Sequence, residues 1–212
     1  MQKRKPIEKT KNFHWFNTNF REKTEDLIRK KNSIYWYLVE LMITKNNRFY
    51  RLYPNAYIES VRKEIEIANI TKEDKILNIG CGPFPNTAII ISEITGAKVV
   101  AMDKNKFSTI LAKKYLNDKN IKNTEIRLGD AINYPMKDFD VILITNCATP
   151  RKKIIENVLK KSKSDCRIIC REVKNTKSSI REYVFLCGGT IKKEIKHDSG
   201  WGWYSYLILK KP

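Results

Sequence analysis

The residues with the clearest capacity for chemistry lie in the segment KILNIGCGPFPN, residues 75–86, where an apolar run enters a turn rich in glycine and proline. Gly80 and Gly82 can adopt positive φ, which lets the backbone approach a ligand closely, and the two prolines suit the start of a helix. Asp103 ends the next apolar run about 20 residues later, where a dinucleotide-binding unit places the carboxylate that binds ribose hydroxyls. Although the third glycine of GxGxxG is absent, the pattern favours a nucleotide-like cofactor over a purely structural turn.

Further candidates come from the ends of the other predicted strands. Ligands of an open parallel sheet bind beyond the carboxyl ends of its strands, so the residues after each strand are candidate cofactor-binding residues. They are Gly80, Cys81, Gly82, Pro83, Asp103, Lys104, Gly129, Asp130, Ala131 and Asn146. Both acids also have structural interpretations, because Asp103 could be a strand-end acid facing solvent and Asp130 could cap the turn at Ile132.

The elements that must position these residues alternate after residue 70. We expect strands at 75–80, 98–102, 124–128, 140–145 and 166–172, with helices at 86–95, 106–116, 151–161 and 176–187. This order predicts an α/β fold with a doubly wound, mostly parallel, Rossmann-like sheet. The last two segments, 189–196 and 201–210, are separated by the turn-forming residues HDSG, which predicts an antiparallel C-terminal hairpin at one edge.

The first third of the chain is expected to be helical. Segments 21–31 and 33–45 contain helix-forming residues, and the second is apolar on most faces, so it should be buried. Residues 55–68 repeat apolar side chains at the spacing of an amphipathic helix. The texture of the sequence changes near residues 69–74. We therefore expect a helical N-terminal extension or lid at 1–70 and a cofactor-binding domain at 71–212.

Composition limits the class of protein and its partners. With 212 residues and 42% hydrophobic content, the chain is neither disordered nor fibrous. A net charge of +19 makes nucleic acid an alternative partner, but lysine is spread evenly through the sequence, which does not favour it. We expect no membrane partner and a cytoplasmic location, because there is no long apolar run and no apolar core of a signal peptide.

Cysteine and histidine do not form a metal-binding pattern. The five cysteines contain no CxxC pair, and the only histidines, His14 and His197, are far apart in the sequence. We therefore expect neither a metal site nor a disulfide framework.

The order of elements and the acids at strand ends resemble the class I S-adenosylmethionine-dependent methyltransferase superfamily. The resemblance rests on the glycine turn, Asp103, Asp130 in LGDA and the reversed final strand. It implies that the glycine turn holds the methionine moiety of S-adenosylmethionine and that Asp103 binds the ribose. It also implies that Asp130 accepts a hydrogen bond from the adenine amine, and that Asn146 lies toward the substrate.

The turn GCGPFPNTA is also similar to the GSGPLPLT turn of nicotianamine synthases and their archaeal relatives. The segment PRKKIIENVLKK, followed by CRIICRE with Arg171, agrees with the same family. That resemblance implies attack by an amine on the aminocarboxypropyl carbon of S-adenosylmethionine instead of on the methyl group. The family's catalytic Glu and Tyr have no assigned counterpart here, although Tyr50, Tyr53, Tyr57 and Glu59 lie in the corresponding part of the chain.

Candidate catalytic residues are weakly marked. Tyr57 or Glu59 could take a proton from an amine acceptor, but their place on an amphipathic helix equally suits packing or solvation. Asn146 is a further candidate, and a Cys147 nucleophile would need a partner that lowers its pKa. We expect the aromatic residues Trp201, Trp203, Tyr204 and Tyr206 to pack in the core. Because Trp201 lies nearest the start of the last strand, we expect that start to lie away from the cofactor.

Together these features predict an S-adenosylmethionine-dependent transferase, with methyl transfer to a small-molecule acceptor as the first hypothesis. Aminocarboxypropyl transfer of the nicotianamine-synthase kind is an alternative. An RNA methyltransferase or RNA-binding protein is another, and a non-catalytic cofactor-binding protein is a third. The oligomeric state and the acceptor stay open at this stage.

Overall fold

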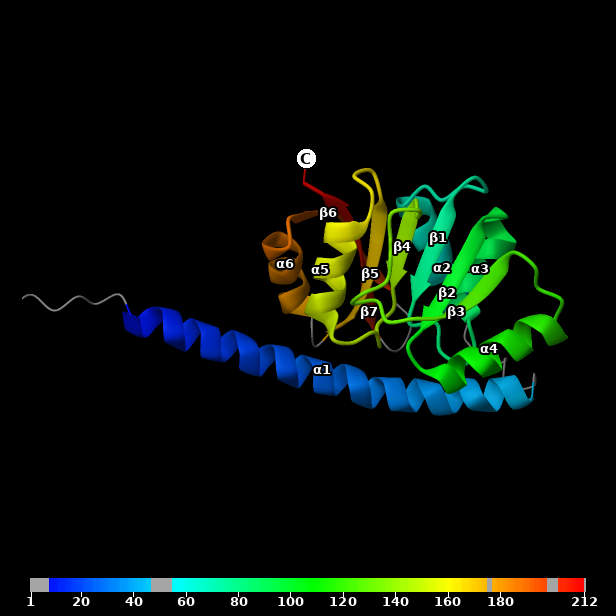
Figure 1. Cartoon of the computed structure of the whole chain (residues 1–212), viewed down its shortest axis with the longest axis horizontal. Coiled ribbons are helices and arrows are strands. Elements are labelled where there is room, and N and C mark those ends of the chain that lie inside the picture. Colours follow the sequence, from blue (N-terminus) through cyan, green and yellow to red (C-terminus); the bar gives the residue numbers. More distant parts are fainter. Residues whose placement is uncertain (1–7, 47–54, 175–176, 198–201, 212) are drawn as a thin grey trace, which may run out of the picture.

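The computed structural model describes residues 8–46, 55–174, 177–197 and 202–211, which form a seven-stranded sheet with helices on both faces (Figure 1). The strands are β1 (Lys75–Ile79), β2 (Lys98–Asp103), β3 (Thr124–Leu128), β4 (Val141–Ile144), β5 (Arg167–Val173), β6 (Gly189–His197) and β7 (Trp203–Lys210). They are arranged in the order β3-β2-β1-β4-β5-β7-β6. The first five pair in parallel, and β7 is antiparallel to both of its neighbours. The predicted fold class is confirmed.

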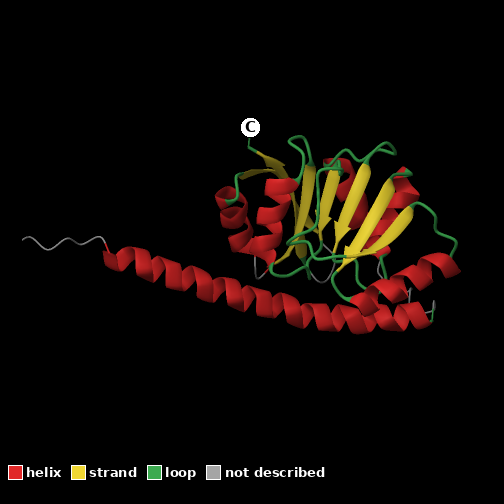
Figure 2. Cartoon of the chain, in the orientation of Figure 1, coloured by secondary structure: helices red, strands yellow, loops and turns green. Residues whose placement is uncertain are grey.

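Six helices are described, and Figure 2 distinguishes them from the strands. They are α1 (Glu8–Lys45), α2 (Asn55–Ile67), α3 (Asn86–Thr95), α4 (Lys106–Asp118), α5 (Arg151–Lys161) and α6 (Lys177–Leu186). Helices α2, α3 and α4 pack on one face of the sheet, and α5 and α6 pack on the other. The boundaries of the strands and helices after residue 70 differ from the predicted ones by no more than a few residues.

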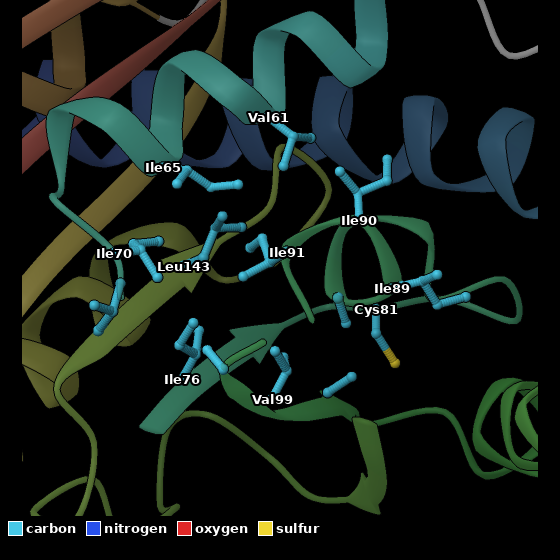
Figure 3. Packing of buried hydrophobic residues seen from close by; sticks show 14 of the residues in the cluster. Val61, Ile65, Ile70, Ile76, Cys81, Ile89, Ile90, Ile91, Val99 and Leu143 are labelled. Atoms are coloured by element: carbon cyan, nitrogen blue, oxygen red, sulfur yellow. The ribbon is translucent and has the colours of Figure 1, made fainter. Parts of the chain in front are cut away.

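The core consists of two apolar layers, one on each face of the sheet. On the first face, Val61 and Ile65 of α2 and Ile91 of α3 lie in one cluster with Ile76 of β1 and Leu143 of β4 (Figure 3). Strand side chains alternate between faces, so the neighbouring strand residues belong to the second cluster, with α5 and α6. Burial on both faces explains why these strands are continuously apolar instead of alternating.

The N-terminal third differs from the prediction in two respects. Segments 21–31 and 33–45 belong to the single helix α1, because no proline or glycine interrupts them. The second segment is only partly buried: Ile43 lies in the core and is 0% exposed, whereas the side chains of Ile34 and Leu38 are 64% and 55% exposed. The physical reason is that α1 crosses one edge of the sheet, so that only part of its surface meets other elements, and its N-terminal part extends beyond the sheet (Figure 1).

Several predicted features lie outside the described residues. These are the candidates Tyr50 and Tyr53, the hairpin residues 198–200 and Trp201. Within the described ranges, no helix combines the length and apolar character that crossing a bilayer requires. The same ranges contain no group of three or more His, Cys, Asp or Glu side chains that could hold a metal ion.

Candidate active site

A cavity of about 670 Å³ lies beyond the carboxyl ends of the parallel strands and is roofed by α1. All ten residues predicted to bind a cofactor line it: Gly80, Cys81, Gly82, Pro83, Asp103, Lys104, Gly129, Asp130, Ala131 and Asn146. Tyr57 of α2 also lines the cavity. Glu59 does not, because its side chain is exposed on the outer side of the same helix. Among the candidates that lie in the described residues, the structure thus brings together all except Glu59.

The glycine turn needs both of its glycines. Gly80 and Gly82 have φ of +80° and +67°, in the region that side chains disfavour. A Cβ at Gly80 would lie 2.6 Å from Thr145 Oγ1, and one at Gly82 would collide with the Glu40 carboxylate. The backbone N–H of Gly80 donates to the carbonyl of Met102 at 2.8 Å, which fixes the turn against the end of β2. The turn therefore presents bare backbone to the cavity.

Asp103 is held by backbone donors on both sides. Its Oδ2 accepts from the N–H of Gly82 at 2.9 Å, and its Oδ1 accepts from the N–H of Asn105 at 2.9 Å. Asn105 in turn caps α4 by accepting from the N–H groups of Phe107 and Ser108, at 2.9 and 3.2 Å. Each carboxylate oxygen keeps further acceptor capacity, which suits ribose hydroxyls. The side chain is thus a rigid acceptor between the turn and α4.

Asp130 accepts a hydrogen bond within its own turn, as the structural interpretation of this residue predicts. Its Oδ1 accepts from the N–H of Ile132 at 3.0 Å, and its side chain is exposed. Neighbouring Gly129 has no room for a side chain, because an added Cβ would lie 2.7 Å from Met102 Sδ. The local hydrogen bond leaves the rest of the Asp130 carboxylate available to a ligand at the cavity edge.

The loop after β4 is fixed from beneath by Arg151. Its Nη2 donates to the carbonyls of Thr145 and Asn146, at 2.8 and 2.7 Å. Within the described structure, Asn146 Oδ1 is buried and has no hydrogen-bond partner, so it is an acceptor that a ligand could satisfy. Burial, together with the Glu40 carboxylate, raises the pKa of the Cys147 thiol to about 12, which argues against a thiolate nucleophile.

A buried network positions Tyr57 at the cavity. Arg171 Nη1 donates to the Tyr57 hydroxyl and to Thr87 Oγ1, both at 3.0 Å. Its Nε and Nη2 donate to the Glu64 carboxylate at 2.8 and 2.6 Å. Although burial opposes it, the Glu64 charge raises the pKa of Arg171, so the guanidinium remains charged. Because Arg171 donates to the Tyr57 oxygen, the phenol's own hydrogen is left for Thr87 or a ligand.

Two cavity residues were missed or misplaced by sequence reasoning. Glu40 reaches the glycine turn from α1, and its only sequence signal is that it is the single acid in the apolar segment 33–45. The expectation that the start of the last strand lies away from the cofactor is wrong. Because β7 runs antiparallel to β5, Trp203 pairs with Val173 at the carboxyl end of β5 and lines the cavity.

The family is decided by a match to a family model. The model described as a methyltransferase domain matches residues 70–203, which is more than half of the chain. The chain belongs to this methyltransferase domain family. It is an S-adenosylmethionine-dependent transferase, and S-adenosylmethionine is its cosubstrate. No curated protein matches the sequence of this methyltransferase.

Solved structures share the methyltransferase fold at low sequence identity. A mutant of MtNAS in complex with S-adenosylmethionine has a TM-score of 0.77 at 17% identity, and the match covers 88% of this chain and 78% of that one. YcgJ from Bacillus subtilis has a TM-score of 0.59 at 14% identity, with 73% and 99% covered. Precorrin-6y C5,15-methyltransferase from Geobacter metallireducens has a TM-score of 0.59 at 16% identity, with 72% and 88% covered.

The cavity of the methyltransferase fits S-adenosylmethionine on structural grounds. The glycine turn forms a cradle that a Cβ at either glycine would fill. Asp103 offers a fixed carboxylate at the end of the neighbouring strand β2. Asn146 Oδ1 adds a buried acceptor that lacks a partner in the described structure. These features supply polar contacts for both the amino-acid and the ribose ends of such a molecule.

Proposed function

We propose that this methyltransferase transfers the methyl group of S-adenosylmethionine to a small-molecule amine held beneath α1. The observation that carries the proposal is the position of Glu40, whose carboxylate projects from the roof of the cavity to the glycine turn. A carboxylate there attracts a protonated amine toward the cofactor end of the cavity. Residues 1–70 then act as the lid of the cofactor domain.

The predicted cofactor residues take distinct parts of S-adenosylmethionine in this proposal. The backbone of the turn at residues 80–83 holds the methionine moiety, and Asp103 binds the ribose hydroxyls. Residues 129–131 lie along the adenine, with the Asp130 carboxylate accepting from its amine. Lys104, which follows β2, donates from Nζ to the carbonyl of Thr149 at 2.9 Å and so joins the loops after β2 and β4 at the cavity.

The acceptor occupies the space between Glu40, Tyr57 and Trp203. Aromatic faces and a carboxylate together favour a cationic group. The amine gives up a proton to Glu40, and its lone pair then attacks the methyl carbon while the bond from that carbon to sulfur breaks. The Tyr57 hydroxyl, oriented by Arg171, and Asn146 Oδ1 supply the remaining polar contacts to the acceptor.

Aminocarboxypropyl transfer is the second candidate, and a specific observation favours it. The match to MtNAS covers 88% of this chain, whereas the matches to YcgJ and to the precorrin-6y methyltransferase cover 73% and 72%, so the likeness to MtNAS extends over more of the chain. One MtNAS structure is a complex with MTA and tNA. In aminocarboxypropyl transfer, the amine would attack the aminocarboxypropyl carbon bonded to the sulfur of S-adenosylmethionine, instead of the methyl carbon. An RNA acceptor has less support, because α1 lies across the cavity.

The nature of the sulfur-containing product tests these proposals. The full chain is incubated with S-adenosylmethionine and a panel of small amines, and the nucleoside products are separated by liquid chromatography with mass detection. Amine-dependent formation of S-adenosylhomocysteine is the expected result. Methylthioadenosine would instead establish aminocarboxypropyl transfer. Absence of both products with amines, together with methylation of RNA, would overturn the small-molecule proposal.

A further inference from the structure

Helix α1 carries a row of apolar side chains that are largely exposed. The side chains of Leu27, Ile34, Leu38 and Met42 are 63%, 64%, 55% and 42% exposed. Their separations of four and seven residues keep them on one side of a helix with 3.6 residues per turn. We call these four residues the outer stripe.

The opposite side of α1 faces the protein and is largely polar. Glu25 and Arg29 are 5% and 1% exposed, Glu40 points into the cavity, and Ile43 is buried in the core. A surface helix normally buries its apolar side, whereas α1 buries charged side chains and leaves the outer stripe exposed. No element in the described part of the chain covers the outer stripe, and contiguous exposed apolar side chains of this kind mark interaction sites.

Positive and negative charges lie on different sides of α1. Every exposed charged side chain between residues 23 and 45 is a lysine, namely Lys23, Lys30, Lys31 and Lys45. The acids of α1 from Glu22 to Glu40 are at most partly exposed. Glu22 lies 3.6 Å from Lys152 Nζ, and Asp26 lies 3.2 Å from Arg29 Nη1. The outer face therefore combines apolar side chains with uniformly positive charge, in a chain of net charge +19.

We propose that the outer stripe and its lysines dock the protein peripherally on an anionic lipid surface. A second copy of the chain would place lysines against lysines, and a nucleic acid would leave the apolar side chains uncovered. The interface of an anionic bilayer accepts both, with the apolar side chains in the acyl boundary and the lysines at the headgroups. Ile34 and Lys31 also line the cavity, so its rim would lie at the docked face.

Vesicle flotation of the full chain tests this proposal. Vesicles of phosphatidylcholine alone are compared with vesicles of equal parts phosphatidylcholine and phosphatidylserine. We expect binding to the anionic vesicles only, weakening as salt rises. Leu27→Glu combined with Leu38→Glu should weaken binding about tenfold or more, because both substitutions remove apolar burial and oppose the surface charge. Neither residue lines the cavity.

The matched control is Phe185→Glu combined with Leu186→Glu on α6. These side chains are 68% and 63% exposed, so the control introduces the same charge at an equally exposed apolar pair. It should retain vesicle binding. The proposal is overturned if the wild-type chain does not float with anionic vesicles, or if the control loses binding equally. A wild-type dimer that the Leu27 and Leu38 substitutions dissociate, without vesicle binding, would assign the stripe to a second copy instead.

Discussion

Glu40 brings a carboxylate into the cavity from α1, which precedes every strand of the sheet in the sequence. It lies close enough to the glycine turn that any side chain at Gly82 would collide with it. This proximity allows one residue to interact with both the cofactor end and the acceptor end of the cavity. In the proposed reaction, Glu40 attracts the amine and receives its proton, whereas Tyr57 orients the acceptor.

Replacing Glu40 by Gln should therefore lower the transfer rate by about 10²- to 10⁴-fold, the usual contribution of a positioned acid or base. Binding of S-adenosylmethionine should be largely retained, because Gln has nearly the same size beside the glycine turn and Asp103 is unchanged. Steady-state kinetics and calorimetric titration separate the two effects. Glu59→Gln is the matched control, since Glu59 is exposed and does not line the cavity. Equal losses in both variants would refute the role of Glu40.

The site residues that could be predicted are those whose position follows from the neighbouring sequence. The residues from Gly80 to Pro83 and Asp103 follow buried strands, and the rule for parallel sheets places their ends together. Glu40 could not be placed in this way, because nothing in segment 33–45 indicates which strand end it meets. The position of Trp203 was predicted wrongly because β7 was treated like a parallel strand. An antiparallel strand begins at the edge of the sheet where the parallel strands end, so Trp203 lies at the cavity.

At the scale of elements, α1 is attached to the α/β domain by buried charges as well as by the buried Ile43. Arg29 Nη2 donates to Glu172 Oε2 at 2.9 Å, and Nε donates to Oε1 at 3.3 Å. Arg151 Nε lies 3.7 Å from the same Glu172 carboxylate, and Arg151 also holds the loop after β4. The roof and the loop that border the acceptor space thus share one anchor. Because buried charges supply much of this attachment, Leu27, Ile34 and Leu38 stay outward, which the pattern of the sequence alone does not reveal.

Removing one charge of this anchor should be strongly destabilising. Arg29→Met removes both hydrogen bonds from Arg29 to the buried Glu172 carboxylate and leaves Arg151 as its cationic neighbour. The free energy of unfolding should therefore fall by about 3–5 kcal/mol. Urea unfolding followed by circular dichroism measures the loss. Lys114→Ala, which breaks the exposed pair with Asp118, should cost less than about 1 kcal/mol. A single-variant loss no larger than that of Lys114→Ala would contradict the anchoring role.

For the whole molecule, the topology could be predicted because each strand and helix after residue 70 carries its own local signal. The strand runs are apolar, the separators contain glycine or turn residues, and the final hairpin follows from the lack of a helix between its strands. The cavity could not be predicted, because it depends on where α1 crosses the sheet. That crossing is set by contacts between residues more than a hundred positions apart, such as Arg29 with Glu172.

The most direct test of the account is a calorimetric titration of S-adenosylmethionine into the wild-type chain and two glycine variants. Gly82→Ala should weaken binding by about tenfold or more, because it adds a side chain at positive φ beside Glu40 within the proposed cofactor cradle. Gly188→Ala is the control, since Gly188 also has positive φ, at +79°, but nothing lies near its Cβ and it does not line the cavity. We predict that the wild-type and Gly188→Ala chains bind alike. Absence of wild-type binding, or equal affinity in the Gly82→Ala chain, would contradict the account.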